Sequence, residues 1–151
     1  MPLAVSAGLA DMAVTTLSRG RCFGSVVFGR KMRLGDLVDH GLATAGADAV
    51  AVGDGRVRLT WGEYRDRVSR LAAQLLRAGV EPGDRVAVHL PKSTESFVAV
   101  HAILRAGAVM VPLDWFASAE FLRSVIDDAE PAALVSRARS SVIDEAVAGS
   151  T

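Results

Sequence analysis

One continuous stretch joins an apolar helix to an apolar strand through a single glycine, and it constrains the fold more than any other part of the chain. It runs from Ile103 to Asp114, reads ILRAGAVMVPLD and has Gly107 at the junction. Glycine is a common residue just past the end of a helix, and a helix that leads into a short apolar strand belongs to a β-α-β unit. The stretch therefore predicts a sheet with parallel strands.

Helical and β patterns alternate along the rest of the chain. Helical periodicity predicts helices over 33–47, 60–79, 93–107, 118–130 and 137–149, and β-favouring runs predict strands over 49–52, 56–59, 85–90, 109–113 and 132–135. Strands that alternate with helices form right-handed crossovers. We therefore predict an α/β fold with a partial doubly wound, largely parallel sheet, flanking helices and an N-terminal β-hairpin at 49–59.

Side-chain patterns predict where the helices begin and which faces they bury. Thr60 and Glu63 form a capping box, Gly79 ends that helix, and Ser93 or Thr94 and Ser118 can cap the next two. The strand 109–113 and the helix 93–107, which is apolar almost all round, should be deeply buried. The helix 60–79 should bury one face that carries Tyr64, Val68, Leu71, Leu75 and Leu76. The helix 118–130 should bury one face that carries Phe121, Leu122, Val125, Ile126 and Ala129.

Composition limits the classes of function. The 151 residues are 50% hydrophobic, which suffices for the core of one domain, and the formal net charge of zero disfavours nucleic acid as a partner. Cys22 is the only cysteine, so an intrachain disulfide and a thiolate metal cluster are excluded, and a reducing cytoplasm is the expected location. No apolar run approaches the roughly 18 residues of a membrane span.

The first 32 residues differ from the remainder. They carry four basic side chains and one acidic side chain, a net of +3 that leaves −3 for the rest. An organellar transit peptide is conceivable from the scarcity of acids. We expect instead that residues 1–32 are a poorly ordered or non-native extension, with Met32 as an alternative start to Met1, and that 33–151 form the folded domain.

Three segments carry a resemblance to a known family. LTWGEY at 59–64, GDRVAVHL at 83–90 and LRAGAVMVPLD at 104–114 resemble, in this order, the N-terminal part of the AMP-forming adenylate ligases, which include acyl-CoA synthetases and nonribosomal peptide adenylation domains. The likeness covers about 33–136. Trp61 and Tyr64 depart from the first motif, and Trp115 stands where a proline is common, which puts the local loop shape in doubt.

The resemblance implies a chemistry but transfers no catalytic residue. Complete members of this family join a carboxylate to the α-phosphate of ATP with magnesium, and they use a Ser/Thr/Gly-rich loop that ends in lysine, downstream acidic residues and a lysine in a C-terminal domain. None of these features occurs in the 151 residues. We therefore expect no catalytic, cofactor-binding or metal-binding residue in this chain, and no cofactor bound by it alone.

Other phosphate motifs fail on inspection. Lys92 and Ser93 resemble the end of a P-loop, but Val86 and Pro91 occupy its glycine positions, and Arg58 replaces the third glycine of a dinucleotide fingerprint. Lys92 could attract a phosphate near a helix N-terminus. An exposed loop lysine is the favoured interpretation.

The remaining polar and aromatic candidates favour structural roles. The three histidines lack metal-site spacing, and we expect His89 and His101 to be hydrogen-bonded structural residues. Asp114 lies just past a strand, where open α/β sheets place their sites, but is more often a turn residue there. The other candidates are His40, expected to bind no metal, Asp127 and Asp128, expected to face solvent, and Trp61 and Trp115, expected to pack.

Three functions remain open. The first is the N-terminal piece of an AMP-dependent carboxylate ligase, inactive alone and completed by a missing remainder. The second is a small α/β interaction or regulatory module that docks on a full-length ligase, because a short apolar sheet favours a covering partner. The third is an independent flavodoxin-like binding domain, for which no phosphate loop is recognisable.

Overall fold

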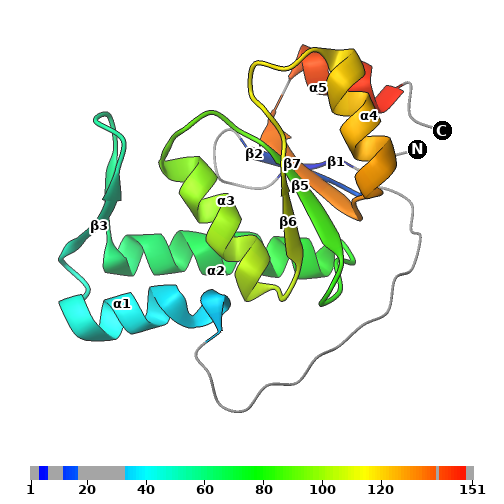
Figure 1. The fold of residues 1–151 in the computed structure, drawn as a ribbon. Coiled ribbons are helices and arrows are strands. Elements are labelled where there is room, and N and C mark those ends of the chain that lie inside the picture. Colours follow the sequence, from blue (N-terminus) through cyan, green and yellow to red (C-terminus); the bar gives the residue numbers. More distant parts are fainter. Residues whose placement is uncertain (1–3, 7–11, 17–32, 139, 149–151) are drawn as a thin grey trace.

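The computed structural model describes residues 4–6, 12–16, 33–138 and 140–148 (Figure 1). Its strands are β1 (Ala4–Ser6), β2 (Met12–Thr16), β3 (Val50–Gly53), β4 (Arg58–Thr60), β5 (Arg85–His89), β6 (Val109–Pro112) and β7 (Ala133–Arg137). Its helices are a short 3-10 turn (Leu34–Asp36), α1 (Leu37–Ala45), α2 (Trp61–Arg77), α3 (Thr94–Arg105), α4 (Ala119–Ala129) and α5 (Ser141–Ala148). Every helix and strand predicted within 33–149 is present.

A five-stranded sheet has the order β1-β2-β7-β5-β6. Strand β5 is parallel to both β6 and β7, whereas β2 is antiparallel to β7 and β1 is antiparallel to β2. β3 and β4 form the separate antiparallel hairpin that the sequence predicts. The predicted α/β fold with a parallel core is confirmed.

Helices cover both faces of this sheet, as Figure 1 shows, with α2 and α3 on one face and α4 and α5 on the other. Alternation along β5 explains the two layers, because Val86 and Val88 belong to the α2–α3 core and Ala87 belongs to the α4–α5 core. A strand with apolar residues on both faces is typical of a sheet covered on both sides.

The hairpin leads into α2 through the predicted capping box. The backbone N–H of Glu63 donates to Thr60 Oγ1 at 3.3 Å, and the N–H of Thr60 donates to Glu63 Oε2 at 2.9 Å. At the other end, Gly79 has a φ of 90°, which a residue with a side chain adopts at a cost. Both predicted ends of this helix are confirmed.

Close contacts hold α1 against its neighbours. Arg105 of α3 donates to Asp39 Oδ2 of α1 at 2.6 Å and to Ser69 Oγ of α2 at 2.8 Å. Gly41 of α1 lies against the Trp61 ring so closely that a Cβ at this position would overlap the ring. The predicted packing role of Trp61 agrees with this contact.

Four predictions of burial are wrong. β6 is an edge strand within the described sheet, with Val109 51% exposed, because β5 is its sole neighbour there. Phe97 on α3 and Phe121 on α4 are also more than half exposed, and Leu76 on α2 is half exposed. Each helix contacts the sheet through one face, so apolar residues elsewhere on the helix stay outside the core.

Strands β1 and β2 lie within residues 1–32, and the pairing of β2 with β7 places them in the sheet. The other residues of this segment lie outside the described part of the chain. The expectation of an unused extension stays a prediction, with this pairing as the observation against it. In the described residues, no helix is long and apolar enough to cross a membrane.

Candidate functional site at the carboxyl edge of the sheet

Three parallel strands end at a common edge, which is formed by the last residues of β5, β6 and β7 and the loops 90–93 and 113–118. We call it the carboxyl edge. Strand β5 continues into α3 in one layer, and its neighbour β7 is followed by α5 in the other layer. The helices that follow the parallel strands β5 and β7 thus lie on opposite faces of the sheet, and open α/β sheets bind ligands at such a switch point.

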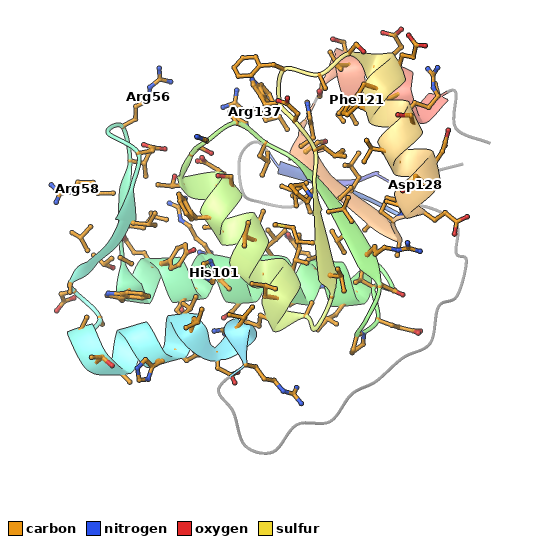
Figure 2. The ribbon with its side chains drawn as sticks, viewed as in Figure 1. Arg56, Arg58, His101, Phe121, Asp128 and Arg137 are labelled. Carbon is orange, nitrogen blue, oxygen red and sulfur yellow. The ribbon has the colours of Figure 1, made fainter. Side chains whose placement is uncertain are left out.

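An aromatic stack lies at this edge. His89, the last residue of β5, stacks on Trp115 of the loop after β6, with ring centroids 4.8 Å apart and an interplanar angle of 26°. The guanidinium carbon of Arg137, the last residue of β7, lies 5.5 Å from the centre of the Trp115 ring. Figure 2 shows Arg137 beside the loop that connects β6 to α4. Three strand ends therefore meet at one indole ring.

His89 is buried without a hydrogen-bond partner. Its side chain is 2% exposed, and neither ring nitrogen makes a hydrogen bond of ordinary geometry. Burial lowers the pKa of His89 below its usual 6.5, although the nearby backbone of Trp115 and Asp114 and the Asp114 carboxylate oppose the shift. The prediction of a hydrogen-bonded His89 is wrong, and the contact that the described residues make with this ring is the stack of Trp115 on its face.

Asp114 has the predicted role of a turn residue. Its Oδ1 accepts a hydrogen bond from the N–H of Phe116 at 3.0 Å, and its carbonyl accepts one from the N–H of Ala117 at 3.2 Å. The turn places Phe116 on the surface, where 90% of the residue is exposed. Trp115, on the opposite side of the turn, packs as predicted.

The N-terminus of α3 reaches the same edge and is tied to the hairpin. Asp54, in the hairpin turn, accepts hydrogen bonds at 2.9 Å from the N–H groups of Val57 and Arg56 and one at 3.1 Å from the N–H of Thr94. These three bonds lower the pKa of Asp54 to about 2. Ser93 caps α3, as predicted, and Lys92 is an exposed loop lysine.

The other candidates lie away from this edge. His101 Nδ1 lies 2.7 Å from the Tyr64 hydroxyl, which is also 3.0 Å from the carbonyl of Phe97, so the prediction of a hydrogen-bonded His101 is confirmed. Burial raises the pKa of Tyr64 to about 12. His40, Asp127 and Asp128 are exposed. Among the described residues, no group of three His, Cys, Asp or Glu side chains could hold a metal ion.

The carboxyl edge offers one imidazole, one carboxylate and the cations Arg137 and Lys92. Sequence reasoning selected His89, Asp114, Trp115 and Lys92 separately, and the structure brings the first three together. Sequence reasoning did not point to Arg137 or to the hydrogen bond between Asp54 and the N–H of Thr94. The position of Arg137 at the end of a predicted parallel strand was the available signal, because such ends meet at one edge.

Comparisons with known proteins agree with this architecture. The family model described as AMP-binding enzyme matches residues 39–150. Enterobactin synthase component F of Escherichia coli strain K12 is 42% identical over 88 residues, which are 58% of this chain and 7% of that protein.

Two solved structures are similar in fold and sequence. One is a protein of Rhodopseudomonas palustris assigned as a long-chain-fatty-acid CoA ligase, with a TM-score of 0.63 and 32% identity over 68% of this chain and 26% of that chain. The other is the N-terminal subdomain of NpsA from Klebsiella oxytoca in complex with anthranilyl-AMSN, with a TM-score of 0.60 and 27% identity over 66% and 26% of the two chains. The chain therefore spans less than a third of each of these relatives, and it belongs to the AMP-binding enzyme family of adenylate-forming ligases.

Proposed function

We propose that this chain supplies the N-terminal framework of an AMP-dependent carboxylate ligase and does not catalyse adenylation alone. In the complete reaction, a carboxylate oxygen attacks the α-phosphorus of ATP, the bond to the β-phosphate oxygen breaks, and pyrophosphate leaves with magnesium. The framework would contribute the parallel sheet and its carboxyl edge. The observation that carries the proposal is the family match over residues 39–150.

Charge at the carboxyl edge supports the predicted inactivity. Phosphoryl and nucleotidyl transfer depends on positioned cations that neutralise the charge on the phosphates. At this edge, the described residues offer Arg137, which lies against the Trp115 ring, and the loop residue Lys92. The Ser/Thr/Gly-rich loop with lysine that complete members use has no counterpart in the sequence. ATP and magnesium would accordingly bind in the presence of a further polypeptide.

An ATP–pyrophosphate exchange assay tests this proposal. The purified 151-residue chain is incubated with ATP, magnesium, labelled pyrophosphate and a panel of fatty, aryl and amino acids, with a full-length adenylation enzyme as the positive control. We expect exchange no greater than that without acid. Acid-dependent exchange well above this background would refute the predicted inactivity. Restoration of exchange by an added partner polypeptide would support a framework that a second chain completes.

A regulatory or docking module is the second candidate function. Two features favour it: the exposed side chains of Phe97, Phe121 and Val109, and the edge of β6 that no described strand pairs with. Apolar surface and unpaired strand edges promote association. Such a module would bind a ligase that is already complete, in the cytoplasm. Co-purification separates the two functions. A stable complex with a ligase whose activity does not need this chain would support the module, and dependence of activity on the chain would support the framework.

A further inference from the structure

The loop 113–118 crosses the carboxyl edge and is held there by few contacts. Its turn is closed by Asp114, and Leu113 at its start is buried. Between these points and Ser118, which caps α4, Ala117 packs against the α4–α5 core, and Trp115 contacts the strand ends through its stack on His89 and through Arg137. Phe116 is 90% exposed. Residues 114–116, in the middle of the loop, therefore contact the strand ends through the Trp115 ring, and the His89 stack is the aromatic part of that contact.

We propose that His89 positions the loop 113–118 through Trp115 only while its imidazole is uncharged, so that the loop is ordered at neutral pH and loosens when His89 takes up a proton. His89 acts through Trp115 and is a positioning residue. The contact needs no bound substrate, so the inference is independent of the ligase function.

The surroundings of His89 explain why a charge would disturb the stack. The imidazole is 2% exposed and has no acceptor of ordinary geometry for the second N–H that protonation adds. The nearby backbone of Trp115 and Asp114 favours the charged ring, but the cost of burial is larger, so a position of the charged ring closer to water is favoured. Arg137 already places a cation against Trp115, and a second cation on the same indole would be repelled by it.

Other charged groups near His89 do not reverse this expectation. Asp114, on the loop itself, attracts an imidazolium, but its carboxylate is engaged by the N–H of Phe116. Burial outweighs the attraction of Asp114 in the balance that sets the pKa of His89, which lies below 6.5. The charged ring therefore favours an open arrangement of the loop.

The two tryptophans allow a direct test. Trp61→Phe leaves Trp115 as the sole tryptophan, and Trp115→Phe leaves Trp61 as the control. Fluorescence and its quenching by acrylamide are followed between pH 7.5 and 5.0. We expect Trp115 to become more accessible with a midpoint below pH 6.5, while Trp61 shows no such change. The transition should vanish when His89→Gln is added and persist with His101→Gln. A transition that survives His89→Gln, or no transition of Trp115, would overturn the inference.

Amide hydrogen exchange at pH 7.5 tests the stack separately from protonation. His89→Phe keeps an aromatic ring without a charge, and His89→Leu removes the ring. Because an aromatic pair contributes about 0.5–1.5 kcal/mol, the leucine variant should exchange the amides of 114–118 roughly two- to twelvefold faster. The phenylalanine variant should exchange near the wild-type rate at pH 7.5 and more slowly than the wild type at pH 5.5, because its ring takes up no proton. Equal rates in the two variants would show that stacking does not position the loop. Trp115→Leu repeats the test from the loop side if a His89 variant does not fold.

Discussion

Two leucines on α2 provide a matched test of the assigned core. Leu71 is 1% exposed and belongs to the core between α2, α3 and the sheet, whereas Leu76 on the same helix is 50% exposed. The sequence pattern places both residues on the buried face. Substitution of each by alanine changes the same atoms in the same helix, so helix propensity cancels in the comparison.

The structure predicts very different costs for these substitutions. A buried Leu→Ala change loses transfer free energy and leaves a cavity, which together cost about 2–5 kcal/mol. Full burial of a leucine side chain is worth about 1.5–3 kcal/mol, so the half-exposed Leu76 should cost about 1 kcal/mol with no cavity. A domain of this size loses about 2–4 °C of Tm per kcal/mol. Leu71→Ala should therefore lower Tm by roughly 4–20 °C and Leu76→Ala by roughly 2–4 °C.

Urea denaturation followed by far-UV circular dichroism measures both free energies of unfolding, and thermal scans give the two Tm values. Equal m-values for the two variants would confirm that the same cooperative unit unfolds. If Leu76→Ala is as costly as Leu71→Ala, the face of α2 that carries Leu76 is covered in the folded protein. In that event the assignment of the core would be wrong.

Three further substitutions test local features of the structure. Thr60→Ala removes the cap of α2 and should lower the free energy of unfolding in urea by about 1 kcal/mol, whereas Thr60→Ser should not. Asp54→Asn should weaken the hairpin turn. The pKa of Asp54 is lowered to about 2 by the fold, so the stability it contributes is present above its usual 3.8 and lost as the pH falls toward 2. That part of the acid transition should be absent in Asp54→Asn when unfolding is followed by circular dichroism. Gly41→Ala forces a Cβ into the Trp61 ring and should lower the free energy of unfolding by about 1–3 kcal/mol, and recovery on Trp61→Leu would identify the ring as the cause.

Local signals predicted the order and the ends of the elements well. Thr60 and Glu63 form a capping box because they are three residues apart at the start of a helix. Gly79 adopts a positive φ at the end of the same helix, which glycine does without steric cost. Apolar residues on both faces of β5 likewise predicted a strand covered on two sides. These features depend on neighbours within a few residues, so the sequence alone contains the information.

Burial of particular side chains depended on tertiary contacts and was predicted less well. Phe97 and Phe121 fit helical apolar patterns, yet each points away from the layer that its helix contacts. β6 has the composition of an interior strand, but its place at the edge of the described sheet follows from strand order. Periodicity gives the directions of side chains around one element and does not give the neighbour that covers them.

The two unusual residues at the carboxyl edge account for each other. In the sequence, Trp115 departs from the proline common in the family, and His89 is a polar residue inside an apolar strand. Each residue considered alone predicts a local irregularity, and His89 predicts a hydrogen bond that the structure lacks. Together they form a ring stack, and the indole shields an imidazole whose nitrogens have no partners. Arg137 lies against the Trp115 ring because β7 ends beside β5 in the sheet. Arg137 and His89 are nevertheless more than forty residues apart in the chain. The chemistry of this edge therefore arises from pairs of residues that no local pattern connects.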